Sequence, residues 1–197
     1  MIRKSRKGIS CRVDPIRSVE EIERIKKLLK DKPRDYCLFV CGINNGLRAG
    51  DLLKIKISDV RHLKPGQTFE LIEQKTKKPN VFMVNHAVHR AIKAHLADWE
   101  RKLAAKGQQL DDGERLFGIK SKVRVHQLIQ IWAKEAGLKG HFSSHTLRKT
   151  FGYMQRTKYG MGFELIAKRF NHSNPAITMQ YIGIQDKEVN AMLMNEI

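Results

Sequence analysis

The chain has 197 residues, of which 41% are hydrophobic and 29% are charged, a globular balance that argues against a disordered, collagen-like or coiled-coil protein. Its 38 Lys and Arg against 20 Asp and Glu give a formal charge of +18, spread along the chain rather than gathered in one tail. So large an excess favours a polyanionic partner, with nucleic acid ahead of an anionic membrane or an acidic protein.

The cysteines and the apolar runs limit the cellular compartment and the cofactors that the sequence allows. Cys37 and Cys41 are four residues apart, where a helix places both on one face, and with Cys11 they are expected to be reduced and buried. No further ligands at coordinating spacing lie near them, so we expect no metal and no cofactor. No stretch approaches the ~20 apolar residues of a membrane span, and no signal peptide follows the basic N-terminus. We therefore expect a cytoplasmic, nucleoid-associated protein without membrane contact.

The N-terminal part divides into an arm and the start of a single domain, expected over 18–197. Residues 1–17 are polar and basic without helical period, which predicts a flexible arm, and order is expected to begin at Ser18. Ser18 and Glu21 form a capping box for a helix that runs to about Asp31. Pro33 begins a second helix, which ends where Asn44, Asn45 and Gly46 supply a stop.

The remaining elements predict an α+β fold that is mostly helical and carries a small antiparallel sheet. Apolar residues from Leu52 to Ile57 suggest a short helix running into an extended stretch. Two extended runs, 69–72 and 81–84, flank a lysine-rich hairpin tip over 74–80, and Asn85 caps a helix to about Ala105. After residue 123 we expect only helices, at about 124–136, 144–158, 162–170, 175–182 and 186–195.

An H-x-x-R pair marks the first chemical signal. Residues three apart share a helix face, so His145 and Arg148 point at one spot, and a phosphate fits such a spot. Alone the pair is weak, because a helical His and Arg more often form a solvated face. Its context is stronger: the segment SSHTLRKTFGYM is followed by FNHSNPAITMQYIGI, in which His172 precedes Tyr181 by nine positions with an expected turn at 173–175 between them.

These segments resemble the tyrosine recombinase, or phage integrase, family. NNGLRAGDLLKIKISDV matches the family's first arginine box at Arg48, with Asp51 where members usually carry an acidic residue. EQKTKKPNVFMVN resembles the hairpin that carries the family's lysine; Lys75 aligns best, and Lys77 and Lys78 are alternatives. The boxes occur in family order over about 18–190, which is far harder to reach by chance than one motif.

The resemblance implies a catalytic fold and a set of six catalytic residues. These are Arg48, Lys75, His145, Arg148, His172 and Tyr181. It implies a site-specific DNA recombinase that cleaves and rejoins strands through a 3′-phosphotyrosine link, without metal or ATP. Double-stranded DNA is the implied partner, with a tetramer assembling on two DNA sites and a monomer in the absence of DNA.

Each residue has an implied role in that chemistry. Arg48 and Arg148 offer planar forks of donors to the phosphate, and Tyr181 attacks phosphorus. His145 acts as base or phosphate donor and His172 as a phosphate donor. Lys75 protonates the departing 5′ oxygen.

Two alternatives and one departure accompany this interpretation. A type IB topoisomerase uses a similar pocket to relax one duplex, and a basic DNA-binding module with decayed catalytic boxes would share the charge. Only 17 residues precede the first expected helix, where members usually have a core-binding domain, so the chain is either shortened or a small recombinase like the fimbrial switch invertases. The target sequence, and the choice among integration, excision, inversion and resolution, do not follow from the sequence.

The other tyrosines and histidines have plain interpretations. Tyr36, Tyr153 and Tyr159 fit ordinary core or surface positions. The remaining histidines are expected to be solvated or capping residues: His62, His86, His89, His95, His126 and His141.

Overall fold

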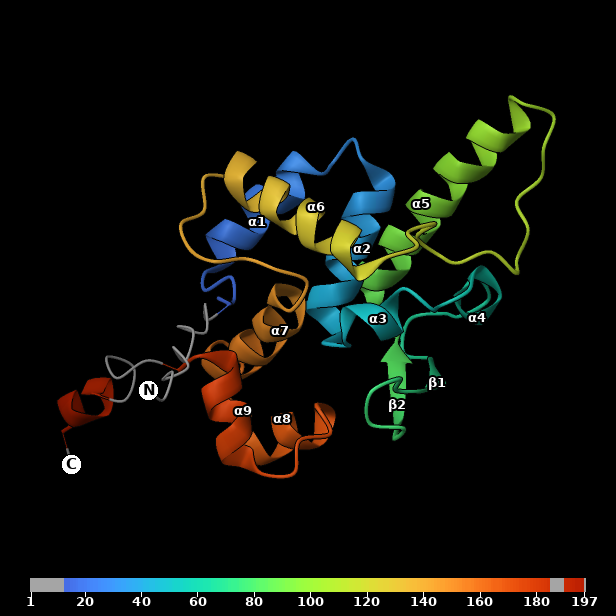
Figure 1. Cartoon of the computed structure of the whole chain (residues 1–197). Coiled ribbons are helices and arrows are strands. Elements are labelled where there is room, and N and C mark those ends of the chain that lie inside the picture. The colour runs from blue at the N-terminus through green and yellow to red at the C-terminus, as the bar shows by residue number, and fades with distance from the viewer. Residues whose placement is uncertain (1–12, 185–189, 197) are drawn as a thin grey trace, which may run out of the picture.

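The computed structural model describes residues 13–184 and 190–196, in which a helical body carries one two-stranded antiparallel sheet at its side (Figure 1). The elements in chain order are α1 (Val19–Leu28), α2 (Pro33–Asn45), α3 (Ala49–Leu52), α4 (Ile57–Val60), β1 (Thr68–Ile72), β2 (Pro79–Met83), α5 (His86–Ala104), α6 (Lys122–Glu135), α7 (Thr146–Thr157), α8 (Phe163–Arg169), α9 (Pro175–Ile182) and the 3-10 helix η1 (Ala191–Met194). This is the predicted mostly helical α+β class.

Local signals set the ends of the first two helices. The Ser18 hydroxyl accepts from the Glu21 backbone N–H at 3.1 Å, and the Glu21 carboxylate accepts from the N–H of Arg17, one residue earlier than a capping box requires. Pro33 occupies the first turn of α2, where its missing N–H costs nothing. Gly46 ends α2 with a φ of 60°, a left-handed conformation that favours glycine.

Helix α2 lies at the centre of the main core, packed between α5 and α7. Cys37 and Cys41 on this helix are buried free thiols, as expected, whereas Cys11 lies outside the described residues. The Asn45 side chain at the end of α2 pairs with the main chain of Met83, accepting from its N–H at 2.7 Å and donating to its carbonyl at 3.1 Å. The sheet is thereby fixed to the helix that precedes Arg48.

The hairpin begins and ends close to its expected bounds. Phe69 pairs with Phe82 and Ile72 with Pro79, so β2 starts at Pro79, two residues before the predicted Val81. Pro79 fits the first position of a strand, where its lost donor does not break the ladder.

Helices α7, α8 and α9 and the hairpin lie together on one side of the helical body (Figure 1). The pair α8 and α9 encloses a small second apolar cluster of Ile166, Phe170 and Ile182, against which the ring of Tyr181 packs. Gly152 on α7 makes this close approach possible, because a Cβ there would stand 2.7 Å from Ile182 and 2.9 Å from Phe170.

Order begins earlier than Ser18. Ile16 is 2% exposed and its N–H donates to the Thr150 hydroxyl at 2.9 Å, while the Asp14 carbonyl accepts from Thr146. Residues 13–17 therefore pack along α7, and the expectation that order starts at Ser18 was wrong for them. The reason is tertiary: α7, far along the chain, supplies the partners. Residues 1–12 of the predicted arm lie outside the described residues.

His95 also departs from its expected place. We expected a solvated or capping residue, but His95 is 3% exposed, contacts the Leu116 carbonyl through Nε2 at 2.7 Å and stacks on Trp99. The spacing explains the burial, because His95 falls three residues after Ile92 on the apolar stripe of α5.

Two further expected elements are present only in part among the described residues. The apolar run after Arg48 forms α3 and α4, with an isolated bridge between Lys56 and Arg115 in place of a longer extended stretch. Of the last predicted helix, the described part is η1, and 185–189 lie outside the described residues. No helix in the described ranges is both long and apolar enough to cross a membrane.

Candidate active site

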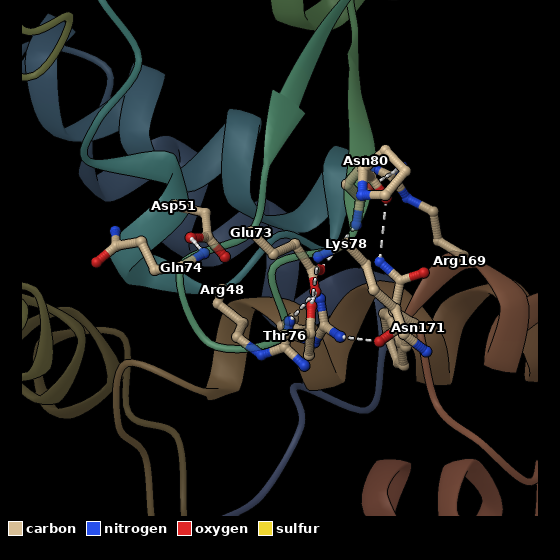
Figure 2. Close-up of polar contacts among 12 residues, drawn as sticks. Arg48, Asp51, Glu73, Gln74, Thr76, Lys78, Asn80, Arg169 and Asn171 are labelled. Atoms are coloured by element: carbon tan, nitrogen blue, oxygen red, sulfur yellow. Dashed lines mark hydrogen bonds and ion pairs between the residues drawn. The ribbon is translucent and has the colours of Figure 1, made fainter.

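Arg48 lies two residues after the left-handed Gly46 and is the N-cap residue of α3. Its side chain is 19% exposed, and Nη1 lies 2.5 Å from a carboxylate oxygen of Glu73, which is fully buried (Figure 2). Glu73 ends the first arm of the hairpin, so this ion pair connects the turn after α2 to the lysine-rich tip. The pKa of Glu73 lies below its ordinary value: burial opposes this, and hydrogen bonds from Thr76 and Asn80 and the charge of Arg48 outweigh it.

Arg148 is on the first turn of α7 and is 2% exposed. Nη1 donates to the Gly46 carbonyl and Nη2 to the Phe170 carbonyl, each at 2.7 Å, and the guanidinium lies over the Phe170 ring at 4.2 Å. Burial lowers the pKa of Arg148 to about 10, so the group remains charged at neutral pH. It joins the turn before Arg48 to the end of α8, and its hydrogen bond with Tyr181 opposes the rise in the pKa of that phenol.

His145 and Tyr181 meet at the N-terminus of α7. His145 is the N-cap residue, and its Nδ1 lies 3.3 Å from the hydroxyl oxygen of Tyr181 on α9. Partial burial lowers the pKa of His145, and the positive charges of Arg148, Lys149, Arg48 and Lys75 lower it further. A neutral imidazole can accept a hydrogen bond from the phenol.

The Tyr181 ring makes edge-to-face contacts with two other rings. Phe170 and His172 lie 5.8 Å and 5.3 Å from it, both at steep angles, and the ammonium of Lys149 lies 5.0 Å from the ring centre. Burial raises the pKa of Tyr181, which the charges of Arg148 and Arg48 oppose. The phenol is therefore protonated at neutral pH and must lose its proton to act as a nucleophile.

His172 lies in the loop between α8 and α9. Its Nδ1 is 2.9 Å from the hydroxyl of Thr178, a fully buried residue of α9. Burial and then the charges of Arg148 and Arg48 lower the pKa of His172 to about 4. When Nδ1 accepts from Thr178, the proton of the neutral ring is on Nε2.

The three hairpin lysines are exposed. The charge of Lys75 contributes to the lowered pKa of His145. The tip is a closed turn: Lys77, with a φ of 57°, donates its N–H to the Glu73 carbonyl at 3.0 Å, and the Lys78 carbonyl accepts from the Glu73 N–H.

Residues 18–188 match the phage integrase family, which covers most of the chain. The chain belongs to the phage integrase family. It is similar to the probable integrase/recombinase YoeC of Bacillus subtilis strain 168, with 34% identity over 182 residues that cover 91% of this chain and 94% of that protein. It is also 27% identical to the tyrosine recombinase XerC of Caldanaerobacter subterraneus over 85% of this chain and 48% of that protein, so it spans about half of that relative.

Solved structures agree with this membership at the level of the fold. The XerA recombinase has a TM-score of 0.69 and 19% identity, and the match covers 98% of this chain and 68% of that one. The XerH site-specific recombinase bound to a palindromic difH substrate has a TM-score of 0.70 and 17% identity, covering 89% and 51%. This member of the phage integrase family is thus a tyrosine recombinase catalytic domain and an enzyme of site-specific recombination. The topoisomerase and decayed-module alternatives gain no support from these likenesses.

Within this phage integrase fold, segments far apart in the sequence bring the predicted site residues to one region. Tyr181 contacts His145 and His172 directly, and the charges of Arg148 and Arg48 act on all three rings. Lys75 stands at the edge of the group, on the exposed tip. Among the described residues, no group of three or more His, Cys, Asp or Glu side chains is arranged to hold a metal ion.

Sequence reasoning missed two residues whose side chains connect these segments, the buried Glu73 and the partly buried Arg169. Glu73 was not among the predicted site residues, yet its carboxylate pairs with Arg48. Arg169 donates to the carbonyls of Asn45 and Val81 and to the side chain of Asn80. The sequence feature that could have pointed to Glu73 is an acidic residue at the end of a strand within a strongly basic segment. No sequence feature points to Arg169.

Proposed function

We propose that the chain cleaves and rejoins duplex DNA at specific sites through a 3′-phosphotyrosine link to Tyr181. The observation that carries this is the Tyr181 hydroxyl 3.3 Å from a neutral imidazole, within the field of two buried or half-buried guanidinium groups. The phenolic oxygen bonds to phosphorus as the bond from phosphorus to the 5′ oxygen breaks. A free 5′ hydroxyl reverses the step, so no nucleotide cofactor is consumed.

His145 takes the proton that Tyr181 loses. The contact between Nδ1 and the hydroxyl gives a direct path, and the lowered pKa of His145 keeps the acceptor available at neutral pH. The raised pKa of Tyr181 makes such a base necessary.

Arg48 and Arg148 stabilise the charge that develops on the non-bridging phosphate oxygens. Both are fixed before DNA binds, Arg148 by two carbonyls and Arg48 by Glu73, so little reorganisation is needed in the transition state. His172, with Nδ1 occupied by Thr178, donates through Nε2 to the same phosphate.

Lys75 is our candidate for the general acid that protonates the departing 5′ oxygen. Its electrostatic proximity to His145 favours it over Lys77 and Lys78. Lys77 takes part in the tight turn through its backbone, and both alternatives lie further along the tip.

Duplex DNA is the proposed partner, and two protomers on each of two sites form the working assembly. The charge of +18 supports a phosphate-tracking surface. Among the structural neighbours are XerH bound to difH and a lambda integrase dimer bound to a COC′ core site. Light scattering with and without the DNA site measures the change from monomer to tetramer.

Covalent capture tests the proposal. A duplex is first selected from a randomised pool by binding to the Tyr181→Phe variant, then synthesised with a nick a few nucleotides from the cleaved phosphate so that the released fragment diffuses away. The wild type should yield labelled protein on a denaturing gel and Tyr181→Phe none, with similar affinity, because only the nucleophilic oxygen is lost.

Tyr159→Phe is the matched control, since Tyr159 is 55% exposed and should leave capture intact. Labelled Tyr181→Phe protein would assign the nucleophile to another residue. Strand exchange between two duplexes, assayed on the same site, separates recombination from simple relaxation of one duplex.

A further inference from the structure

Glu73 is fully buried in a strongly basic region, and its two carboxylate oxygens bond to different partners (Figure 2). Oε2 pairs with Nη1 of Arg48 and also accepts a very short hydrogen bond from the Thr76 hydroxyl. Oε1 accepts from the Asn80 amide at 2.8 Å. One side chain therefore contacts the turn after α2, the hairpin tip and the start of β2.

Asn80 extends these contacts to α8. Its side-chain oxygen Oδ1 accepts from Nη1 of Arg169 at 2.6 Å, and Nη2 of Arg169 donates to the main-chain carbonyl of Asn45, also at 2.6 Å. Asn45 lies in the chain just before Arg48. The contacts thus close a ring from Arg48 through Glu73, Asn80 and Arg169 back to the turn that carries Arg48.

Lys75 lies between two residues that this ring fixes. Glu73 precedes it by two positions, and Thr76 follows it and bonds to the same carboxylate. The intervening Gln74 donates its N–H to Asp51 at 2.9 Å and its amide to the Gly50 carbonyl at 2.6 Å. The residue before Lys75 is therefore attached to the segment that begins at Arg48, and the residue after it is attached to Glu73.

We infer that Glu73 is a positioning residue that sets Arg48 and Lys75 relative to each other, so that phosphate stabilisation and leaving-group protonation are aligned at one phosphodiester. The same oxygen holds Arg48 on one side and the residue after Lys75 on the other. This inference rests on the proposed roles of Arg48 and Lys75. The opposing possibility is that Glu73 occupies Arg48 in place of a phosphate and restrains the enzyme.

The test compares two substrates that differ in the leaving group. Cleavage of the nicked duplex is measured in single turnover with the normal 5′ oxygen and with a 5′-bridging sulfur, which departs without a proton. Lys75→Ala should recover on the sulfur substrate, because only the acid is missing, whereas Arg48→Lys should not. These two variants are the reference points.

Glu73→Gln should slow cleavage of the oxygen substrate by roughly 10²-fold, the scale of a misplacement near 1 Å. On the sulfur substrate its defect should shrink but persist, falling between the references, since the Lys75 part is bypassed and the Arg48 part is not. Glu70→Gln, which changes an exposed carboxylate on β1 three residues before Glu73, is the matched control and should leave both rates unchanged.

Thr76→Ala provides a second variant that keeps the Glu73 charge and its pair with Arg48. It disturbs the Lys75 side alone, so its defect should recover fully on sulfur. If the melting temperature shows that Glu73→Gln does not fold, Thr76→Ala still tests whether contacts to Glu73 position Lys75.

The outcomes separate this inference from the proposed function. The positioning of both groups would be overturned if Glu73→Gln cleaved at the normal rate or had equal defects on both substrates, or if Thr76→Ala did not recover on sulfur. Faster cleavage by Glu73→Gln would show that Glu73 restrains the enzyme instead. Absence of covalent capture by the wild type, or no sulfur recovery in Lys75→Ala, would instead count against the proposed function itself.

Discussion

Nδ1 of His145 lies 3.3 Å from the hydroxyl oxygen of Tyr181, although 36 positions separate the two residues. Their pKa values move apart: the surroundings lower that of His145 and raise that of Tyr181. A protonated phenol beside a neutral imidazole is the pairing that a nucleophile and its base require at neutral pH.

The pH dependence of cleavage should follow His145. Since its pKa is below the ordinary value of 6.5, the ring stays neutral, and able to accept a proton, where a free histidine is already charged. We expect the acid limb of the single-turnover profile to lie below pH 6.5 and to disappear in His145→Gln. Rates that rise as the pH falls through 6.5 would instead make His145 a cationic phosphate donor.

Unfolding must be followed over the same pH range. His172, with a pKa of about 4, binds a proton more weakly in the folded than in the unfolded protein. The contribution of His172 to the free energy of unfolding is therefore fully present above about pH 6.5 and is lost as the pH drops toward about 4. Melting temperatures at each pH identify the range in which the cleavage profile reports chemistry.

Arg148→Lys should lose both activity and stability. Lysine keeps a charge but cannot supply both Gly46 and Phe170, so a buried carbonyl is left without its donor at a cost of roughly 1–3 kcal/mol. Cleavage should fall by about 10² or more as a transition-state donor is lost. Arg48→Lys, which keeps a charge beside Glu73, should lose cleavage with a smaller change in melting temperature; equal melting losses would contradict the bridging role of Arg148.

Gly152→Ala should impair cleavage without removing any reacting group. The added methyl meets Ile182 on α9 and Phe170 at distances too short to keep, so α9 and with it Tyr181 must shift. Overpacking of this kind costs about 1–3 kcal/mol. Gly113→Ala, in an exposed loop with ordinary contacts, is the control; a Gly152→Ala variant that captures DNA at the normal rate would show that α9 tolerates the shift.

DNA affinity should fall steeply with salt. Displacing counterions at Z phosphates gives a logarithmic slope of about −0.9Z, and the charge of +18 predicts several such contacts. Fluorescence anisotropy of labelled duplex with Tyr181→Phe, which avoids covalent trapping, measures this slope between roughly 50 and 200 mM salt. A flat response would argue against a surface that follows the phosphate backbone.

The sequence by itself determined the family, the fold class and most helix bounds, because these depend on local signals. Ser18 caps α1, Pro33 opens α2, Gly46 closes it and Asn85 caps α5, each through contacts within a few residues. The boxes around Arg48, His145 and Tyr181 were equally visible, since each is a short run of residues.

Tertiary structure alone decided which groups contact one another. Asp14 and Ile16 are fixed by α7, and His95 is buried because its position on the stripe of α5 outweighs its polarity. The partner of Glu73 is Arg48 rather than a neighbouring lysine, because the turn after α2 brings a guanidinium to the end of β1. Such pairings depend on how elements pack in space, and a buried charge takes the partner that packing supplies.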